Sequence, residues 1–330
     1  MKKLFLSLVA AIVAATATYA QNTLVATLTH GDNVSYYYGA GAFGSAHNAA
    51  VSGDIITLSG GVFSDVTLTK ALTIRGTGID ATTLTEIQNI IIDIPESDSL
   101  QFSMEGVNCT STLSMKGSCI TPYFLKCKFN SVSFSSSSSI KDATFVNCKI
   151  RNSLYLGSKS TLKMAHSFVQ NFNNGSSHYG SKAQFVYCVV RGLFQYMYDS
   201  SFINSIVCST SPSDSNYLPS ATVAMNTLAI GRSPYTNMQG SEVDCDWYSS
   251  YSSVFNSYSG TYSDSETFEL TEEVKTNYTS TDGTTEIGLY GGQNPYSPTP
   301  LYPRISTMNV AKQATADGKL SVEIEVSAAQ

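Results

Sequence analysis

The chain has 330 residues, which is enough for one elongated domain or two compact ones. Charged residues make up 13% of it, against roughly 25% in an average globular protein. A long uncharged polar surface over a thin apolar core is therefore expected. The formal net charge of −6 argues against nucleic acid or an anionic membrane surface as a general partner.

Residues 1–20 have the pattern of an export signal. Lys2 and Lys3 precede an apolar run over 4–17, and small residues lead up to Ala20. Cleavage is expected after Ala20. The run is too short to span a bilayer comfortably, and no later stretch is long and apolar enough to do so. The sequence predicts a protein that is secreted or lies at the outer cell surface, with no transmembrane span.

A small cap is expected at the start of the mature chain. Short strands are predicted over 24–29 and 34–38, and a helix over 42–51, where Phe43, Ala46, Ala50 and Val51 share one apolar face. An exposed sheet edge invites pairing with another chain, so a covering element is needed at this end of an extended sheet.

A short phrase recurs down the middle of the chain with a period of about 20 residues. It consists of an apolar residue, any residue, often Asn, then Cys, Ser or Thr, and after one more residue another apolar one. The copies lie at 124–129, 145–150, 164–169, 185–190 and 202–207, with degraded ones at 106–109, 224–227 and 254–257. Such a period, with β-type residues and no helical pattern, predicts a solenoid of stacked strands.

The copy at 143–150 shows how one coil is expected to fold. Ala143, Phe145, Cys148 and Ile150 point inward, on either side of a corner at 146–147, where Asn tolerates the left-handed conformation. Stacking then places Phe124, Phe145, Met164, Phe185 and Phe202 in one buried column. A second column holds Phe129, Ile150, Val169, Val190 and Val207.

The cysteines follow the same repeat. Cys109, Cys127, Cys148 and Cys188 are assigned to one slot of the coil, which holds Ser or Thr in other copies. A slot that accepts all three residue types favours buried free thiols. A bridge between Cys127 and Cys148 remains an alternative, because neighbouring coils lie about 4.8 Å apart. Cys119, Cys208 and Cys245 are assigned to no slot.

The entry to this repeat resembles that of a known superfamily. The predicted helix is followed by Gly-Asp-Ile-Ile-Thr-Leu-Ser-Gly-Gly-Val-Phe at 53–63 and by Leu-Thr-Lys-Ala-Leu-Thr-Ile-Arg-Gly at 68–76. This order, with the Phe-x-Asn-Cys-x-Ile coils, is similar to pectate-lyase-like right-handed parallel β-helices over roughly residues 41–260. The resemblance implies an all-β, right-handed parallel β-helix. It does not imply an activity, because the superfamily includes lyases, hydrolases, adhesins and non-catalytic surface proteins.

The expected organisation has four parts. They are a signal peptide at 1–20, a parallel β-helix with its cap at 21–290, a Pro/Gly linker at 291–303 and a β-hairpin element at 304–330. Two segments interrupt the period, a Ser/Pro loop at 209–220 and an insertion at 232–253.

A sparse basic stripe is the first candidate site. It consists of Lys126, Lys128, Lys149, Arg151 and Arg191, with Tyr187 nearby. One interpretation is a groove for an anionic glycan, with cations on its acidic groups and Tyr faces on sugar rings. The alternative is an ordinary polar outer surface whose Lys residues discourage aggregation. Stacked outward carboxylates and tandem-Asp motifs, which the resemblance would imply for polysaccharide-cleaving members, are absent from these coils.

The insertion carries a second candidate site. Glu242, Asp244 and Asp246 alternate along what is expected to be one strand, so their oxygens would share a face suited to Ca²⁺. Trp247 and Tyr248 follow and suit sugar stacking. An ordinary polar loop is the alternative. Ca²⁺ is the one cofactor that this pattern leaves open.

The sequence therefore favours an exported, surface-associated, non-catalytic protein that binds or supports other material. It would be adhesin-like, with a polysaccharide or a host or cell-surface glycan as its partner. The alternative is a polysaccharide lyase or glycoside hydrolase that acts on an acidic polysaccharide. The oligomeric state stays open.

Overall fold

The structure is a computed structural model. It describes residues 24–135, 140–157, 159–173, 181–193, 200–209, 223–231, 240–299, 301–302, 304–310, 318–319 and 322–327. The predicted signal peptide and its cleavage site lie outside these residues.

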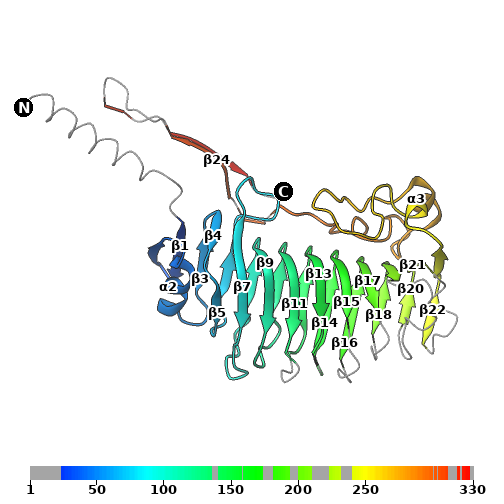
Figure 1. Cartoon of the computed structure of the whole chain (residues 1–330), viewed down its shortest axis with the longest axis horizontal. Coiled ribbons are helices and arrows are strands. Elements are labelled where there is room, and N and C mark those ends of the chain that lie inside the picture. Colours follow the sequence, from blue (N-terminus) through cyan, green and yellow to red (C-terminus); the bar gives the residue numbers. More distant parts are fainter. Residues whose placement is uncertain are drawn as a thin grey trace, which may run out of the picture.

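Two long sheets run side by side along a rod (Figure 1). Sheet A is 12-stranded, in the order β2 (Asn33–Tyr38), β1 (Val25–His30), β3 (Ile55–Leu58), β6 (Thr73–Arg75), β8 (Ser103–Glu105), β10 (Tyr123–Leu125), β12 (Ala143–Val146), β14 (Thr161–Ala165), β16 (Lys182–Val186), β18 (Ser201–Ile203), β20 (Val223–Met225) and β22 (Ser241–Val243). Sheet B is 11-stranded, in the order β4 (Gly61–Phe63), β7 (Thr85–Ile92), β9 (Asn108–Met115), β11 (Lys128–Phe134), β13 (Lys149–Tyr155), β15 (Phe168–Asn173), β17 (Val189–Leu193), β19 (Ile206–Ser209), β21 (Leu228–Ile230) and β23 (Asp246–Tyr248), with β5 (Val66–Leu68) also on β7. From β5 onward the chain alternates between the sheets, and from β3 onward all neighbouring strands in both sheets are parallel. The predicted all-β parallel solenoid is confirmed.

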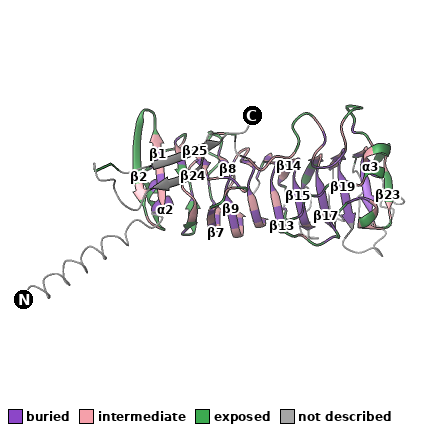
Figure 2. Ribbon diagram, turned by 90° about the horizontal axis from the view of Figure 1, so that it is seen from above, coloured by how far each residue is buried: buried purple, intermediate pink, exposed green. Residues whose placement is uncertain are grey.

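The interior is the stack of columns that the repeat predicts. Phe124, Phe145, Met164, Phe185 and Phe202 are paired in register along sheet A. The rings of Phe124 and Phe145 stack at 4.5 Å, and those of Phe185 and Phe202 at 5.0 Å. All these side chains are buried, and the buried residues form a band along the rod (Figure 2). Both predicted columns are confirmed, the second by the register of sheet B.

The corner between the sheets is a column of left-handed residues. Lys126, Asn147, His166, Tyr187 and Asn204 have φ between 46° and 54°. Each donates its backbone N–H to a carbonyl on the next coil, as Asn147 does to Ala165 at 3.1 Å. The next position is the small-residue slot, where Ser167 accepts the N–H of Cys148 at 3.0 Å. All seven cysteines are free, so Cys127 and Cys148 are not bridged.

The first predicted copy of the repeat is one residue out of register. Cys109 pairs with Phe129, which places Val107 in the small-residue slot and Gly106 at the corner. The prediction that Cys109 fills the slot and Asn108 the corner is therefore wrong. Gly106, with φ of 67°, reaches the left-handed region at lower cost than Asn does.

The last coil was also misassigned. Residues 254–257 are not a coil, and the interval 232–253 contains one, because Val243 pairs with Met225 and Asp246 with Leu228. Cys245 lies in the small-residue slot of this coil, between Asp244 at the corner and Asp246. The pattern was hidden because Glu242 and Trp247 occupy positions that are apolar and inward in earlier coils.

The N-terminal end is covered by a helix, α2 (Ala42–Ala49), that packs on β1 and β3. Phe43 and Ala46 on its apolar face are fully buried. The predicted extension to residue 51 is wrong, because the helix ends at Ala49 and Val51 is exposed. The Lys70 ammonium donates to the carbonyls of His47, Asn48 and Ala50 at 2.7–3.1 Å, which satisfies orphan carbonyls at the end of the helix. No helix in the described part of the chain is long and apolar enough to cross a membrane.

Beyond β23 the chain turns back and runs along the corner toward the N-terminal end (Figure 1). We call residues 251–302 the strap. It contains the 3-10 helix η3 (Tyr251–Ser253) and α3 (Glu272–Asn277), and it includes most of the predicted 291–303 linker. After it, β24 (Arg304–Val310) and β25 (Val322–Ser327) pair antiparallel.

Candidate functional site

The strap covers a column of outward residues on sheet B, next to the corner. We call it the outer column. The register aligns Glu86, Asn108, Lys128, Lys149, Phe168, Val189, Ile206, Leu228 and Asp246 on successive strands. The two lysines of the predicted basic stripe that belong to this column therefore face the strap.

The C-terminal half of the outer column is apolar. Phe168, Val189, Ile206 and Leu228 are buried, although they point away from the rod interior, and they form a second hydrophobic cluster with the strap. The ring of Phe168 lies 4.2 Å from that of Phe268 and 5.6 Å from that of Tyr258. Burial of these rings fixes the strap on the rod.

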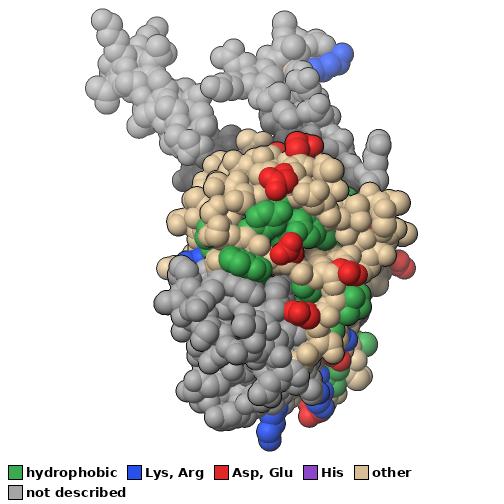
Figure 3. Space-filling model, turned by 90° about the vertical axis from the view of Figure 1, so that its right-hand side faces the viewer, with side chains coloured by type: hydrophobic (Ala, Val, Ile, Leu, Met, Phe, Trp, Pro, Cys, Tyr) green, Lys and Arg blue, Asp and Glu red, His purple; other side chains and the backbone are tan. Residues whose placement is uncertain are grey.

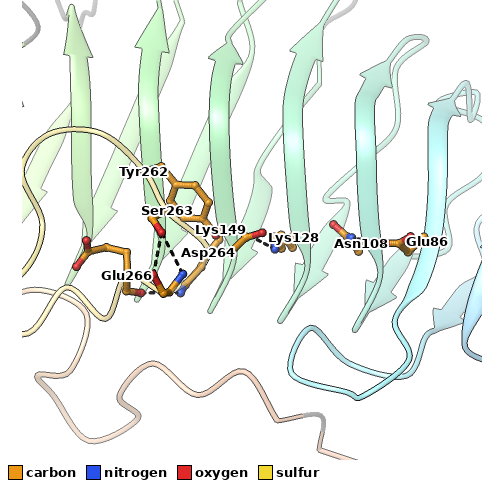
Figure 4. A network of polar contacts seen from close by, with 9 residues as sticks. Glu86, Asn108, Lys128, Lys149, Tyr262, Ser263, Asp264 and Glu266 are labelled. Carbon is orange, nitrogen blue, oxygen red and sulfur yellow. Dashed lines mark hydrogen bonds and ion pairs between the residues drawn. The ribbon is translucent and has the colours of Figure 1, made fainter.

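The N-terminal half of the outer column is polar, and the strap places polar groups against its lysines (Figure 4). The Lys128 ammonium lies 2.6 Å from a carboxylate oxygen of Asp264, which also accepts the Tyr262 hydroxyl at 2.9 Å. The hydrogen bond from Lys128 is the main reason that the pKa of Asp264 is lowered. One coil earlier, the Asn108 amide donates to Glu86 at 2.8 Å.

Lys149 is the second cation of this network, and unlike Lys128 it forms no ion pair with a carboxylate of the described residues. It donates to the Glu266 carbonyl at 3.4 Å and lies 5.2 Å from the Tyr296 ring centroid and 5.5 Å from that of Phe268. Burial lowers the pKa of Lys149, and the neighbouring Lys128 charge adds to this. A cation with a lowered pKa is a feature of candidate catalytic sites as well as of packed interfaces.

A small cavity adjoins these lysines. It has a volume of about 200 Å³. Its polar lining consists of Lys128, Lys149, Asp80, Asp264, Tyr262 and Tyr296. The cavity thus brings two cations, two carboxylates and two phenols together between rod and strap, and it is the candidate site closest to the predicted stripe.

The corner residues of the stripe are also tied to the strap. Lys126 is 3% exposed and donates to the Thr299 carbonyl, and burial lowers its pKa. The Tyr187 hydroxyl donates to Ser280 at 3.0 Å, and its ring stacks on His166 at 4.9 Å. The His166 ring nitrogen Nδ1 lies 3.2 Å from the Leu289 carbonyl.

The two arginines of the stripe lie farther from the corner, on the outer face of sheet B. Arg191 donates to the Asn171 amide oxygen at 2.6 Å. The Nε atoms of Arg151 and Arg191 are buried without a partner. The structure thus brings Lys128 and Lys149 together at the cavity, and Lys126 and Tyr187 beneath another part of the strap. Glycan binding by these residues stays a prediction.

The acidic residues of the second candidate site lie on two strands and at the corner between them. Glu242 is in β22 at a position aligned with inward Ala224, Asp244 is at the corner with φ of 51°, and Asp246 is in β23. The alternation on one strand that motivated a Ca²⁺ site is therefore wrong. Asp246 accepts the Tyr278 hydroxyl. Within the described ranges, His, Cys, Asp and Glu side chains form no group of three or more that could hold a metal ion.

The aromatic residues of that site lie at the C-terminal end of the rod. Trp247 is 46% exposed, and Tyr248 packs edge-on against Tyr278 at 6.2 Å. Acidic side chains surround a hydrophobic patch on this end (Figure 3). Sugar stacking by Trp247 stays a prediction.

Sequence reasoning missed the strap residues Asp264, Glu266 and Tyr296. The available signal was the outer column itself, where Phe168, Val189 and Ile206 stand in positions that a solvent-exposed strand would fill with polar residues.

No family model, no curated protein and no solved structure matches the chain.

Proposed function

We propose that the chain is an exported, surface-associated, non-catalytic solenoid that binds glycans on its outer surface, in the manner of an adhesin. The observation that supports this is the rod with its long outer faces; the strap's carbonyls and the Asp264 carboxylate take up Lys126, Lys128 and Lys149, so glycan binding is assigned to the outer surface that the strap leaves open. These three lysines therefore contact the strap of the chain itself. A stiff rod with long outer faces is suited to displaying a binding surface.

We also propose that the solenoid is right-handed and related to the pectate-lyase-like superfamily. Right-handed crossovers are strongly favoured between parallel strands of one sheet. The sequence from Gly53 through β6 supports the kinship.

An array of neutral and acidic glycans, probed with mature chain 21–330, tests the proposed function. We expect saturable binding, and no release of sugar products from any polysaccharide over hours. Absence of binding to every glycan would contradict the proposal, and so would catalytic release of products.

The second candidate function is cleavage of an acidic polysaccharide, which the cavity at Lys149 favours. A lysine with a lowered pKa beside Asp80 and Asp264 has the elements of a general base with acidic neighbours. If this function is correct, the chain releases unsaturated or reducing sugars from a uronate polymer, and Lys149→Met abolishes that release. Steady product release that is unchanged in Lys149→Met would place the chemistry elsewhere.

A further inference from the structure

The outer face of sheet A carries a groove at the N-terminal end of the rod, where the strap ends. Its volume is about 550 Å³. The lining residues that offer polar atoms or a ring are Thr27, Thr57, Ser59, Arg75, Thr77 and Tyr302. None of them belongs to the strap cavity.

The strand register explains why these groups share one face. Thr27 on β1 is aligned with Thr57 on β3, and Thr57 with Arg75 on β6, so their side chains point the same way on neighbouring strands. Two hydroxyls and a guanidinium thus lie in a row across the groove. Ser59 and Thr77 follow beyond β3 and β6.

One aromatic side chain lines the groove, and the neighbouring edge strand carries others on the same face of the sheet. Tyr302, in the strap, donates its hydroxyl to the Gly76 carbonyl, and the Arg75 guanidinium lies 5.4 Å from its ring centroid. On the other side, edge strand β2 places Tyr36 opposite Thr27 and Tyr38 opposite Val25. Tyr36 is 59% and Tyr38 66% exposed, and β2 is largely exposed in Figure 2. Exposed apolar surface beside a groove is a feature of ligand-binding sites.

Arg75 has no ion-pair partner among the described residues. The carboxylate that faces it from the next strand is Glu105, at the aligned position of β8. An oxygen of Glu105 accepts the Leu301 N–H at 2.9 Å, and burial raises the pKa of this carboxyl. The strap therefore engages Glu105, with which Arg75 interacts electrostatically but forms no ion pair, and the guanidinium keeps donors for a ligand. A guanidinium pairs bidentately with a carboxylate.

We propose that this groove binds a short oligosaccharide that carries a carboxylate. Arg75 pairs with the carboxylate, and the hydroxyls of Thr27 and Thr57 form hydrogen bonds with sugar hydroxyls. The rings of Tyr302 and Tyr36 lie against the apolar faces of the pyranoses. Few polar groups placed around aromatic surface are the usual composition of a small-ligand site. The inference rests on the proposed function and assigns a place and a ligand class to it.

Isothermal titration of mature chain 21–330 with three probes tests the site. The probes are 3′-sialyllactose and trigalacturonate, which carry carboxylates from two different sugars, and neutral lactose. We expect at least one acidic probe to bind and lactose to bind more weakly. Which acidic probe binds distinguishes a sialic acid from a uronate as the source of the carboxylate.

Substitutions locate the binding. Arg75→Gln should lower the affinity for the acidic probe by about tenfold or more, which is the usual effect of losing a charge-assisted pair. The affinity for lactose should stay unchanged. Tyr36→Ala should also lower the affinity for the acidic probe, because it removes a ring that lies against a pyranose, and it does so without changing the charge. Lys163→Gln removes one positive charge farther along the same sheet, and Tyr155→Ala removes an exposed ring from sheet B. Both controls should bind like the wild type, and all four variants should keep the wild-type Tm.

The outcomes separate this inference from the proposed function. Glycan binding on the array with no affinity for the two acidic probes, or with full affinity in Arg75→Gln, overturns the groove site and leaves the proposed function standing. Equal losses in Arg75→Gln and Lys163→Gln show non-specific charge attraction and also overturn the site. No binding to any glycan overturns both.

Discussion

The outer column of sheet B changes character within one coil, from Lys149 to Phe168, which are aligned partners on neighbouring strands. On the N-terminal side, the strap is held by an ion pair and hydrogen bonds to Lys128 and Lys149. On the C-terminal side, it is held by buried rings and aliphatic side chains around Phe168. The same segment is thus fastened to the same column by two kinds of interaction.

The two halves are expected to differ greatly in energy. A buried phenylalanine contributes about 3–5 kcal/mol when judged by its truncation to alanine. A partly exposed ion pair contributes about 0–1 kcal/mol. The apolar half should therefore anchor the strap, and the polar half should set where it lies.

Phe168→Ala should have the largest effect. It removes a fully buried ring from the strap cluster and should destabilise strap docking by about 3–5 kcal/mol. Hydrogen exchange should rise sharply over 254–289 while the rod strands stay protected. Phe145→Ala, inside the rod, is the matched control and should instead loosen β10, β12 and β14. Unchanged exchange over 254–289 in Phe168→Ala would contradict the anchor role.

Acid should loosen the strap through His166, with a smaller effect. Burial lowers the pKa of His166 below its ordinary value of 6.5, so the neutral ring is favoured while the strap is docked. An undocked His166 takes up a proton more readily, so docking is strongest above pH 6.5 and weakens as the pH falls below it.

The measurement is hydrogen exchange of amides 287–292 between about pH 7 and pH 5, corrected for intrinsic exchange. His166→Gln should remove the pH dependence. Burial also lowers the pKa of His47, which lies in the N-terminal cap, so His47→Gln is the control and should leave this dependence intact. A dependence that persists in His166→Gln would refute the assignment.

Asp264→Asn should lower the free energy of unfolding by about 0.2–1 kcal/mol, because Asp264 is largely exposed and its ion pair with Lys128 is screened by solvent. The pKa of Asp264 is lowered by Lys128, so the contribution is full at neutral pH and is lost as the pH falls below the ordinary value of 3.8. Chemical denaturation at pH 7 and pH 3 measures it. Asp142→Asn, which breaks the Lys163 pair on the rod, should leave exchange in the strap unchanged. A loss above 2 kcal/mol for Asp264→Asn would contradict the ranking of the two halves.

Lys149→Met should have the smallest effect on stability. It removes a half-buried cation that has only a 3.4 Å hydrogen bond, and it keeps most of the packing against Tyr296 and Phe268. The free energy of unfolding should stay within about 1 kcal/mol of the wild type or rise. A large loss would mean that the charge itself fastens the strap.

The rod interior was predictable because its signal is local. Alternation around Phe145 and Ile150, with Asn147 at the corner, repeats in each coil, and stacking turns that repeat into the buried columns. The predictions failed where a different residue type occupies a position of the repeat. Gly106 takes the corner in place of Asn, and Glu242 with Trp247 breaks the apolar pattern of the last coil.

The strap was not predictable in the same way. Its contacts join residues far apart in sequence, as Lys126 and Thr299 are, and no period links the two partners. The outer column did carry a signal, because apolar Val189 and Ile206 are costly on a solvent-exposed face. That signal indicates that a cover exists, but not which segment supplies it. The groove at Arg75 depends on the strap as well, because Tyr302 borders it.

Acetylation of lysines in the native protein tests the docked strap most directly. Lys141 and Lys163 have side chains that are 60% and 50% exposed, whereas the Lys128 side chain is 12% exposed and Lys126 is 3% exposed. Mass spectrometry after brief treatment should find Lys141 and Lys163 modified, with Lys126 and Lys128 protected until the protein is unfolded. Equal modification of all four lysines in the native protein would contradict the account.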